Sequence, residues 1–161
     1  MTIAVGDPIP DVTVSIMKDG SPADISAREL LGSGRVVLFA VPGAFTPGCS
    51  KVHLPGYAQN AQEIAAKGVD QIACISVNDT FVMEAWGEAH GVIGSITMVG
   101  DGDANFAQAT GLVVDLPSAG LGHRSQRYAM VINEGVVEEL LLEENGLSVA
   151  NSTAECVLDR L

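Results

Sequence analysis

Short apolar runs recur along the chain and predict the strands of a sheet. Residues 35–41, 69–77 and 95–100 are almost continuously apolar and rich in β-branched side chains, which is typical of strands covered on both faces. Residues 11–17 instead alternate apolar and polar positions, as expected of a strand with one exposed face. We therefore predict a central sheet that is largely buried.

Between these runs, apolar positions recur with the spacing of amphipathic helices. The segments that we predict to be helical are 25–31, 47–67, 78–91, 103–111 and 151–161. Asn78 or Asp79 is expected to cap the third helix, because either side chain can accept a hydrogen bond from a free backbone N–H. Asn151 or Ser152 is expected to cap the last helix for the same reason.

The last third of the chain carries the signature of a hairpin. Residues 127–133 and 135–143 are apolar strand candidates separated by the turn residues Glu134 and Gly135. Strands that alternate with helices, followed by a hairpin and a final helix, predict an α/β, thioredoxin-like fold with a mixed central sheet flanked by helices. Alternation alone also fits a flavodoxin-like sheet, but the hairpin argues against it. No linker or repeat interrupts residues 1–161, so we expect one domain.

Composition and charge exclude several classes of protein. The chain has 161 residues and a net charge of −12, so it repels nucleic acid and anionic membrane surfaces. No apolar stretch has the length of a membrane span. The N-terminal sequence MTIAVGDPIPDV lacks the basic and apolar regions of a signal peptide. We therefore expect a cytoplasmic, reducing environment.

The three cysteines, Cys49, Cys74 and Cys156, are too few and too widely spaced for a disulfide framework. The histidines are not spaced with them as a structural zinc site requires. We expect no metal and no organic cofactor. The chemistry is therefore expected to depend on a thiol.

One cysteine stands in a segment of unusual composition, VPGAFTPGCS, residues 41–50. Thr46 is a good N-cap and Pro47 a preferred first helical residue, so we predict that the helix starts at Pro47 and that Cys49 lies in its first turn. Free backbone N–H groups and the positive end of the helix dipole stabilise a thiolate there. Pro55 removes a backbone donor further along and predicts a kink or break in the helix.

The same segment resembles a known family. Pro42, Thr46 and Cys49 form the pattern P-x-x-x-T-x-x-C, which is similar to the active-site signature of peroxiredoxins, and PGAFTPGCS resembles the loop of the type II, or peroxiredoxin-five-like, subfamily. The segments HLPGY, KGVDQIACISVNDTFVMEAWG and RSQRYAMVINEGVVEEL resemble that subfamily in the same order. Gly48 departs from the family, which often has a larger residue there.

The resemblance implies a role for each residue of the motif. Cys49 would be the peroxidatic cysteine, whose thiolate attacks a hydroperoxide and becomes a sulfenic acid. Thr46 would hydrogen-bond the sulfur and the attacked oxygen, and Pro42 would shield the sulfur from water. Backbone N–H groups at Gly48 and Cys49 would bind the peroxide, and Arg127 would supply the cation beside the sulfur. The substrates implied are hydrogen peroxide and small alkyl hydroperoxides.

The other cysteines leave alternatives open. Cys74 follows Cys49 by 25 residues, which resembles the two-cysteine pattern of plant type II members, so it is a candidate resolving cysteine. It also lies in the middle of a predicted buried strand, where core packing is the simpler interpretation, and a disulfide needs Cα atoms within about 7 Å. Otherwise glutathione, glutaredoxin or thioredoxin would reduce Cys49 directly. Cys156 is expected to be a filler or a surface thiol.

Three further expectations concern partners and nearby charges. The resemblance implies a homodimer that packs near the active site. Several apolar residues could form a pocket rim, a dimer surface or core: Phe45, Phe81, Met83, Trp86 and Leu116. Arg124 is expected to lie at the surface or in an interface.

Two alternative functions use the same cysteine. A redox-sensing binding protein would pass oxidation from Cys49 to a partner without turnover. A cysteine hydrolase would pair Cys49 with His53, one helical turn later. No third group that would orient the histidine is evident, so we expect His53 to lie on the helix surface near the pocket and to be dispensable for peroxidase activity.

Overall fold

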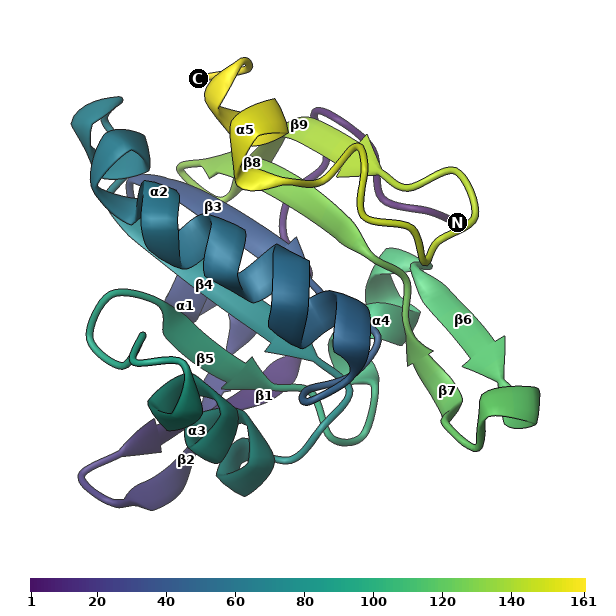
Figure 1. Cartoon of the computed structure of the whole chain (residues 1–161). Helices are drawn as coiled ribbons and strands as arrows, with labels where there is room; N and C mark the ends of the chain where they lie inside the picture. The colour runs from purple at the N-terminus through teal and green to yellow at the C-terminus, as the bar shows by residue number, and fades with distance from the viewer.

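A computed structural model describes all 161 residues and is built around a seven-stranded sheet with the strand order β2-β1-β5-β4-β3-β8-β9 (Figure 1). Strands β3, β4 and β5 are parallel to one another, and the other pairings are antiparallel. The strands are β1 (Thr13–Lys18), β2 (Ser21–Ser26), β3 (Arg35–Ala40), β4 (Gln71–Ser76), β5 (Thr97–Gly100), β8 (Tyr128–Asn133) and β9 (Val136–Leu142). This mixed sheet, flanked by helices, confirms the predicted α/β, thioredoxin-like fold.

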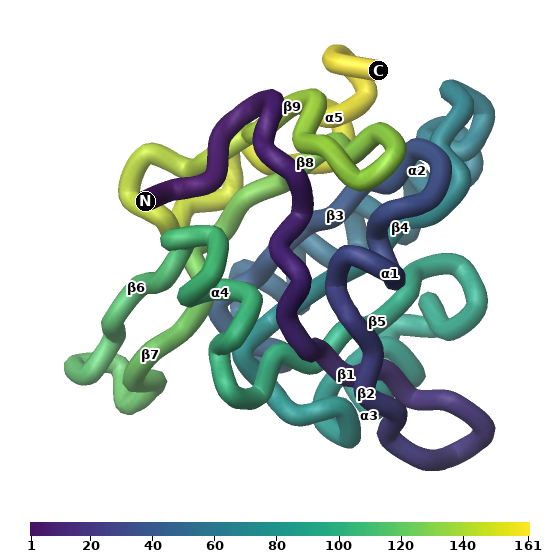
Figure 2. Tube along the Cα trace, turned by 180° about the vertical axis from the view of Figure 1, so that it is seen from behind, coloured from purple at the N-terminus to yellow at the C-terminus, as the bar shows by residue number.

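Helices cover both faces of the sheet, and each face has its own apolar core. One core packs α2, α3 and α5 on the sheet, and the other packs α1 and α4 on the opposite face (Figures 1 and 2). The helical elements are α1 (Ala27–Leu31), η1 (Cys49–His53), α2 (Leu54–Ala66), α3 (Thr80–Ala89), α4 (Asn105–Thr110), η2 (Pro117–Ala119) and α5 (Ala154–Leu158). No helix is long and apolar enough to cross a membrane.

Most predicted elements are present, and the missed ones are exposed. Strand β2 contains Pro22 and few apolar residues, because it is an edge strand that needs no buried face. A separate two-stranded hairpin, β6 (Val113–Leu116) and β7 (Gly122–Ser125), was also not predicted. Both lack the continuous or alternating apolar runs from which the other strands were predicted.

The two expected helix caps have different outcomes. Asp79 caps α3, since its Oδ1 accepts a hydrogen bond from the Val82 N–H at 2.9 Å. The predicted cap of the last helix is wrong: Thr153, not Asn151 or Ser152, caps α5. The side chains of the two expected caps point elsewhere: Ser152 Oγ donates to Glu143 Oε1 at 2.8 Å, and Asn151 Nδ2 donates to the Leu142 carbonyl at 3.4 Å.

The N-terminal segment runs along the back of the molecule and joins elements that are distant in sequence (Figure 2). The Ile3 N–H donates to the Thr110 carbonyl at the end of α4, and the Gly6 N–H donates to the Val137 carbonyl in β9. These bonds join α4 to the β8–β9 hairpin at the edge of the sheet.

Candidate functional site

Cys49 lies in the first turn of the helix that follows β3, at the carboxyl end of the parallel strands. Residues 47 and 48 are already helical, as predicted, and the first amide of the turn with a backbone partner is that of Ser50, which donates to the Thr46 carbonyl. The N–H groups of Gly48 and Cys49 have no acceptor within the chain. They therefore remain available to bind an oxygen atom beside the sulfur.

Thr46 contacts the sulfur rather than capping the helix backbone with its side chain. Its Oγ1 lies 2.9 Å from Cys49 Sγ and 2.7 Å from the Gly43 carbonyl oxygen. A hydroxyl has one proton to donate, so it can serve only one of these acceptors at a time.

Arg127 is the buried cation of the site. Each nitrogen of its guanidinium has one partner: Nη2 donates to Cys49 Sγ at 3.1 Å, Nη1 to His53 Nδ1 at 2.9 Å and Nε to the Leu147 carbonyl at 3.0 Å. The residue is only 4% exposed, and no carboxylate forms a salt bridge with it. An unpaired buried charge is costly, so a thiolate at Cys49 is its natural counter-ion.

The sequence suggested that His53 lies on the helix surface, and this prediction is wrong. The residue is only 1% exposed. Its Nε2 lies 2.9 Å from the Ser152 carbonyl, and its Nδ1 faces Arg127. A carbonyl only accepts and a guanidinium only donates, so the ring is neutral with its proton on Nε2. Burial, together with the charge of Arg127, lowers the pKa of His53 to about 4.

This arrangement removes the basis of the Cys–His hydrolase interpretation. Both ring nitrogens of His53 are occupied by Arg127 and Ser152, so neither can take a proton from Cys49. Burial of His53 could have been inferred from spacing, because Cys49, His53 and Tyr57 follow one another at intervals of four on one helix face. All three are buried.

Gly48 and Pro42 are the other two residues of the predicted motif whose surroundings the structure shows. A Cβ atom at Gly48 would lie 3.3 Å from Arg127 Nη2 and 3.6 Å from Val149 Cγ2, so the small residue leaves room beside the guanidinium. Pro42 is buried just after β3, and its carbonyl accepts from Arg124 Nη1 at 3.4 Å.

Arg124 is half-buried, so a place at the surface or in an interface stays a prediction, and its guanidinium joins several backbone carbonyls near the site. Its Nη1 also donates to the Val77 carbonyl at 3.2 Å, and its Nε donates to the Leu121 carbonyl at 2.9 Å. These bonds tie the β6–β7 hairpin to the loops that follow β3 and β4.

The break predicted near Pro55 takes the form of a π-helix. In η1 each backbone hydrogen bond joins residues five apart instead of four, and the Leu54 N–H donates to the Cys49 carbonyl. Pro55 has no N–H and its ring would clash with the carbonyl four residues earlier, so the α pattern cannot continue through it. The regular helix α2 therefore begins only at Leu54.

The remaining cysteines lie apart from this geometry. All three thiols are free, and Cys74 is fully buried in the middle of β4, paired with Phe39 on one side and Met98 on the other. Burial, and to a smaller extent Cys49, raises the pKa of the Cys74 thiol. Cys156 is half-buried at the start of α5, and its Sγ donates to the Ala150 carbonyl at 3.2 Å.

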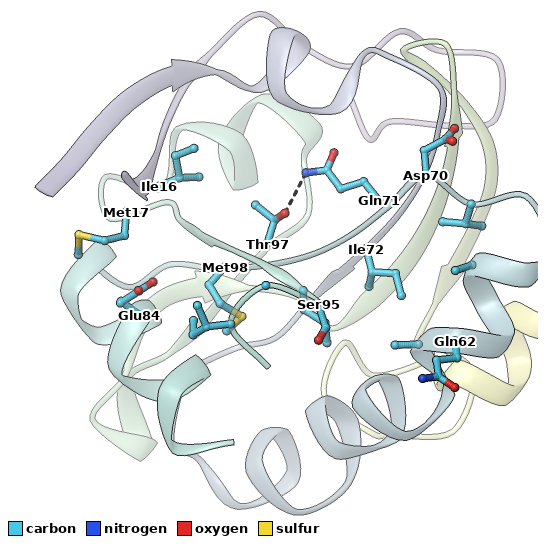
Figure 3. Close-up of a pocket in the computed structure, with 16 residues that line it drawn as sticks. Ile16, Met17, Gln62, Asp70, Gln71, Ile72, Glu84, Ser95, Thr97 and Met98 are labelled. Atoms are coloured by element: carbon cyan, nitrogen blue, oxygen red, sulfur yellow. Dashed lines mark hydrogen bonds between the residues drawn. The ribbon is translucent and has the colours of Figure 1, made fainter. Parts of the chain in front are cut away.

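A cavity of about 520 Å³ lies where β4 and β5 begin (Figure 3). It is not at this site, because Cys49 follows the end of β3. Its lining is mostly apolar, Gln71 Nε2 donates to Thr97 Oγ1 across it at 3.0 Å, and its only charged residues are Asp70 and Glu84. No group of three or more His, Cys, Asp or Glu side chains could hold a metal ion anywhere in the chain.

Comparisons with known proteins agree with the geometry. A family model described as Redoxin matches residues 4–158. Peroxiredoxin-2E-2, chloroplastic, from Oryza sativa subsp. japonica is 48% identical over 159 residues, which cover 96% of this chain and 71% of the relative. Peroxiredoxin-2B from Arabidopsis thaliana is 41% identical over 160 residues, which cover 99% of this chain and 98% of the relative.

A solved structure extends the likeness to three dimensions. Reduced Prx3 from Vibrio vulnificus in complex with hydrogen peroxide has a TM-score of 0.94 and 48% identity, covering 99% of both chains. The peroxiredoxin-2 relatives agree with the type II resemblance of the loop around Cys49. The chain therefore belongs to the redoxin family and, within it, to the peroxiredoxins, which are thiol peroxidases.

Proposed function

We propose that this peroxiredoxin reduces hydrogen peroxide and small alkyl hydroperoxides with Cys49 as the nucleophile. The observation that carries the proposal is the pair of donors on one buried sulfur: Thr46 Oγ1 at 2.9 Å and Arg127 Nη2 at 3.1 Å. The likeness to a relative solved with hydrogen peroxide supports the choice of substrate. The buried sulfur favours small peroxides over bulky ones.

In the proposed step, an electron pair of the Cys49 thiolate attacks one oxygen of ROOH and the O–O bond breaks. The sulfur is oxidised to a sulfenic acid, which keeps that oxygen, and the other oxygen leaves as RO⁻ and takes a proton to become water or an alcohol. Arg127 and the free N–H groups of Gly48 and Cys49 stabilise the charge that moves onto the oxygens. Buried Pro42 keeps bulk water away from the sulfur.

The sulfenic acid is then reduced by an external thiol. Cys74 is the alternative reductant, but it lies in the centre of β4, between two strands that hold its backbone. Its raised pKa also keeps it a thiol, which is a poor nucleophile. We therefore favour direct reduction by glutathione, glutaredoxin or thioredoxin.

The proposal includes the assembly and the compartment. We propose that residues 1–161 act as one peroxidase domain and pair as a homodimer near the active site. Phe45, on the loop of Thr46, is 55% exposed and Phe81 is 64% exposed, whereas Met83 and Trp86 are fully buried. Leu116 is half-buried. Phe45 and Phe81 are therefore the best candidates for a dimer surface. Sedimentation of the wild type and of Phe45→Ser tests this. Cytoplasmic placement is a separate prediction, because two relatives are named as chloroplastic.

The test of the activity is turnover. Catalytic amounts of the protein should consume many equivalents of hydrogen peroxide with glutathione and glutaredoxin, or with thioredoxin, and Cys49→Ser should consume none. One oxidation per chain with every donor would instead favour the redox-sensing protein. Intact mass after one equivalent of peroxide separates the two routes of reduction: a Cys49–Cys74 disulfide in the wild type would make Cys74 the resolving residue.

A further inference from the structure

Glu143 is a buried carboxylate that the proposed reaction does not use. It follows β9, is 2% exposed and has no cationic partner. Its Oε1 accepts four hydrogen bonds, from the N–H groups of Ala150, Asn151 and Ser152 and from Ser152 Oγ, at 2.8 to 2.9 Å. Its Oε2 is buried without a partner. These bonds outweigh the effect of burial and leave the pKa of Glu143 below its ordinary value, so the group is anionic.

The segment that Glu143 holds, residues 145–153, contacts both the backbone and the guanidinium of Arg127. Its Gly146 carbonyl accepts from the Arg127 backbone N–H at 2.7 Å. Its Leu147 carbonyl accepts from Arg127 Nε at 3.0 Å. Its Ser152 carbonyl accepts from His53 Nε2, and the other nitrogen of that ring faces Arg127 Nη1. The third nitrogen of the guanidinium, Nη2, is left for the sulfur. Two carbonyls of one segment therefore fix the plane in which Arg127 points at Cys49.

The two halves of this segment are held differently. The first half closes on itself, because Asn145 Oδ1 accepts from the N–H groups of Leu147 and Ser148 at 2.9 and 2.8 Å. The second half has no such local turn, and three successive N–H groups of residues 150–152 converge on the Glu143 carboxylate. Hydrogen bonds to an ionised group are roughly twice as strong as neutral ones.

We propose that Glu143 is a positioning residue for the peroxide reaction, which folds residues 145–153 over Arg127 and so keeps the guanidinium aimed at Cys49 Sγ. The inference rests on the proposed function, in which that guanidinium stabilises the thiolate and the transition state. Glu143 acts through the Ser152 carbonyl and His53 and does not itself touch the sulfur. Loss of its charge loosens the segment and lets the guanidinium turn away.

The test compares Glu143→Gln with Glu144→Gln. The first variant keeps the shape of the side chain and removes its charge, and the second removes the same charge from the exposed neighbouring residue, which has no hydrogen-bonded side chain. Glu143→Gln should slow oxidation of Cys49 by hydrogen peroxide about 10-fold, the effect of a difference of about 1.4 kcal/mol. Glu144→Gln should stay within about twofold of the wild type.

A second readout separates positioning from stability. The rate at which iodoacetamide alkylates Cys49 in slightly acidic buffer reports how much thiolate Arg127 stabilises, and it should fall in Glu143→Gln but not in Glu144→Gln. A Glu143→Gln protein that only melts at a lower temperature, with unchanged oxidation and alkylation rates, overturns the inference. If Glu143→Gln does not fold, Ser152→Ala, which removes one of the four bonds, should reduce both rates in the same direction, and unchanged rates would overturn it.

Failure of the proposed function gives a different result. If the wild type does not consume peroxide, the peroxidase proposal fails, while the alkylation rates of the two glutamine variants still decide whether Glu143 positions Arg127.

Discussion

At the scale of single residues, we attribute the reactivity of this protein to one buried thiol and one buried guanidinium. Arg127 has no carboxylate partner, and its Nη2 lies 3.1 Å from Cys49 Sγ. A low local dielectric strengthens their attraction and makes the unpaired state of either group unfavourable. The pair therefore places a cationic donor directly on the sulfur.

Substitution of Arg127 should abolish most of the peroxide reaction. We expect Arg127→Ala to lower the rate of Cys49 oxidation by about 10²- to 10³-fold, as removal of a preorganised donor does elsewhere. Arg160→Ala is the matched control, because Arg160 is half-exposed and pairs only with Glu139 at 3.2 Å. Rapid-mixing kinetics with hydrogen peroxide measure both. Retention of the wild-type rate in Arg127→Ala would remove this arginine from the site.

The hydroxyl of Thr46 should matter through its proton and not through its shape. Thr46→Val keeps the volume and removes the donor, so we expect the oxidation rate to fall about 10- to 100-fold, within the range of a lost charge-assisted hydrogen bond. Thr46→Ser restores the donor and should recover most of the rate. Equal rates in the two variants would contradict a role for the hydroxyl.

His53 predicts how stability depends on pH. The unfolded chain protonates this ring near its ordinary pKa, about 6.5, whereas the folded protein protonates it only near about 4. Since the folded pKa is the lower one, stability is lost as the pH falls through this window, by up to about 3 kcal/mol. In His53→Gln this loss is absent. The free energy of unfolding, measured with urea, should therefore differ less between wild type and His53→Gln at about pH 4 than at about pH 7. A gap that stays constant would contradict the neutral ring.

Part of the site could be predicted from the sequence at this scale, and part could not. Cys49, Thr46 and Pro42 lie within one short loop, where a capping residue and a proline have local meaning, and Arg127 was found by resemblance. His53 was expected at the surface because no orienting partner was visible, although its spacing with Cys49 and Tyr57 indicates a buried face. Its partner is a backbone carbonyl 99 residues away, at Ser152, which no local pattern reveals. Glu143 was missed because its ligands are backbone amides.

At the scale of elements, η1 decides where the sulfur lies. The π-helical turn adds one residue to the turn between Cys49 and the regular helix α2, and Trp86 Nε1 supports it by donating to Ser50 Oγ at 3.0 Å. Its position directly before Pro55 could be predicted as a break, though not as a π-helix. Pattern also located the buried strands, but it could not find β2 or the β6–β7 hairpin, which have no buried apolar face.

Removal of the proline should let the α pattern continue and shift Cys49 away from its partners. We expect Pro55→Ala to leave the protein at least as stable as the wild type and to lower the oxidation rate about 10-fold, since a displacement of about 1 Å has effects of this order or larger. Gly56→Ala is the control, because it raises helix propensity next to the proline and its Cβ meets nothing within 4 Å. Thermal melts measure the stability of both variants, and peroxide kinetics measure their rates of Cys49 oxidation. An unchanged rate in Pro55→Ala would make the π-helix incidental.

At the scale of the whole molecule, Cys49 and the cavity of about 520 Å³ lie at opposite ends of the parallel strands. The loop that carries Cys49 follows β3, and the cavity lies at the opposite end, where β4 and β5 begin. Cys74 lies between these ends in the core that packs α2, α3 and α5 on the sheet. Its position ties it to the stability of the fold more than to the chemistry at Cys49.

Substitution of Cys74 should therefore change stability and leave the first chemical step unchanged. Cys74→Ser buries a hydroxyl in the core and should lower the free energy of unfolding by about 1–3 kcal/mol. Cys156→Ser, at a half-buried position, should cost less. Both variants should react with hydrogen peroxide at the wild-type rate and turn over with an external thiol. Loss of turnover in Cys74→Ser alone, in a folded protein, would favour Cys74 as the resolving cysteine.

The most direct test uses the single tryptophan as a reporter of the site. Trp86 is fully buried and hydrogen-bonded to Ser50, next to Cys49, so its fluorescence should change when the sulfur is oxidised. Rapid mixing with hydrogen peroxide should give a fluorescence change whose rate rises linearly with peroxide in the wild type, and mass mapping should find the added oxygen on Cys49. The change should be absent in Cys49→Ser. Peroxide consumption that continues in Cys49→Ser, or an unmodified Cys49 in the wild type, would contradict the account.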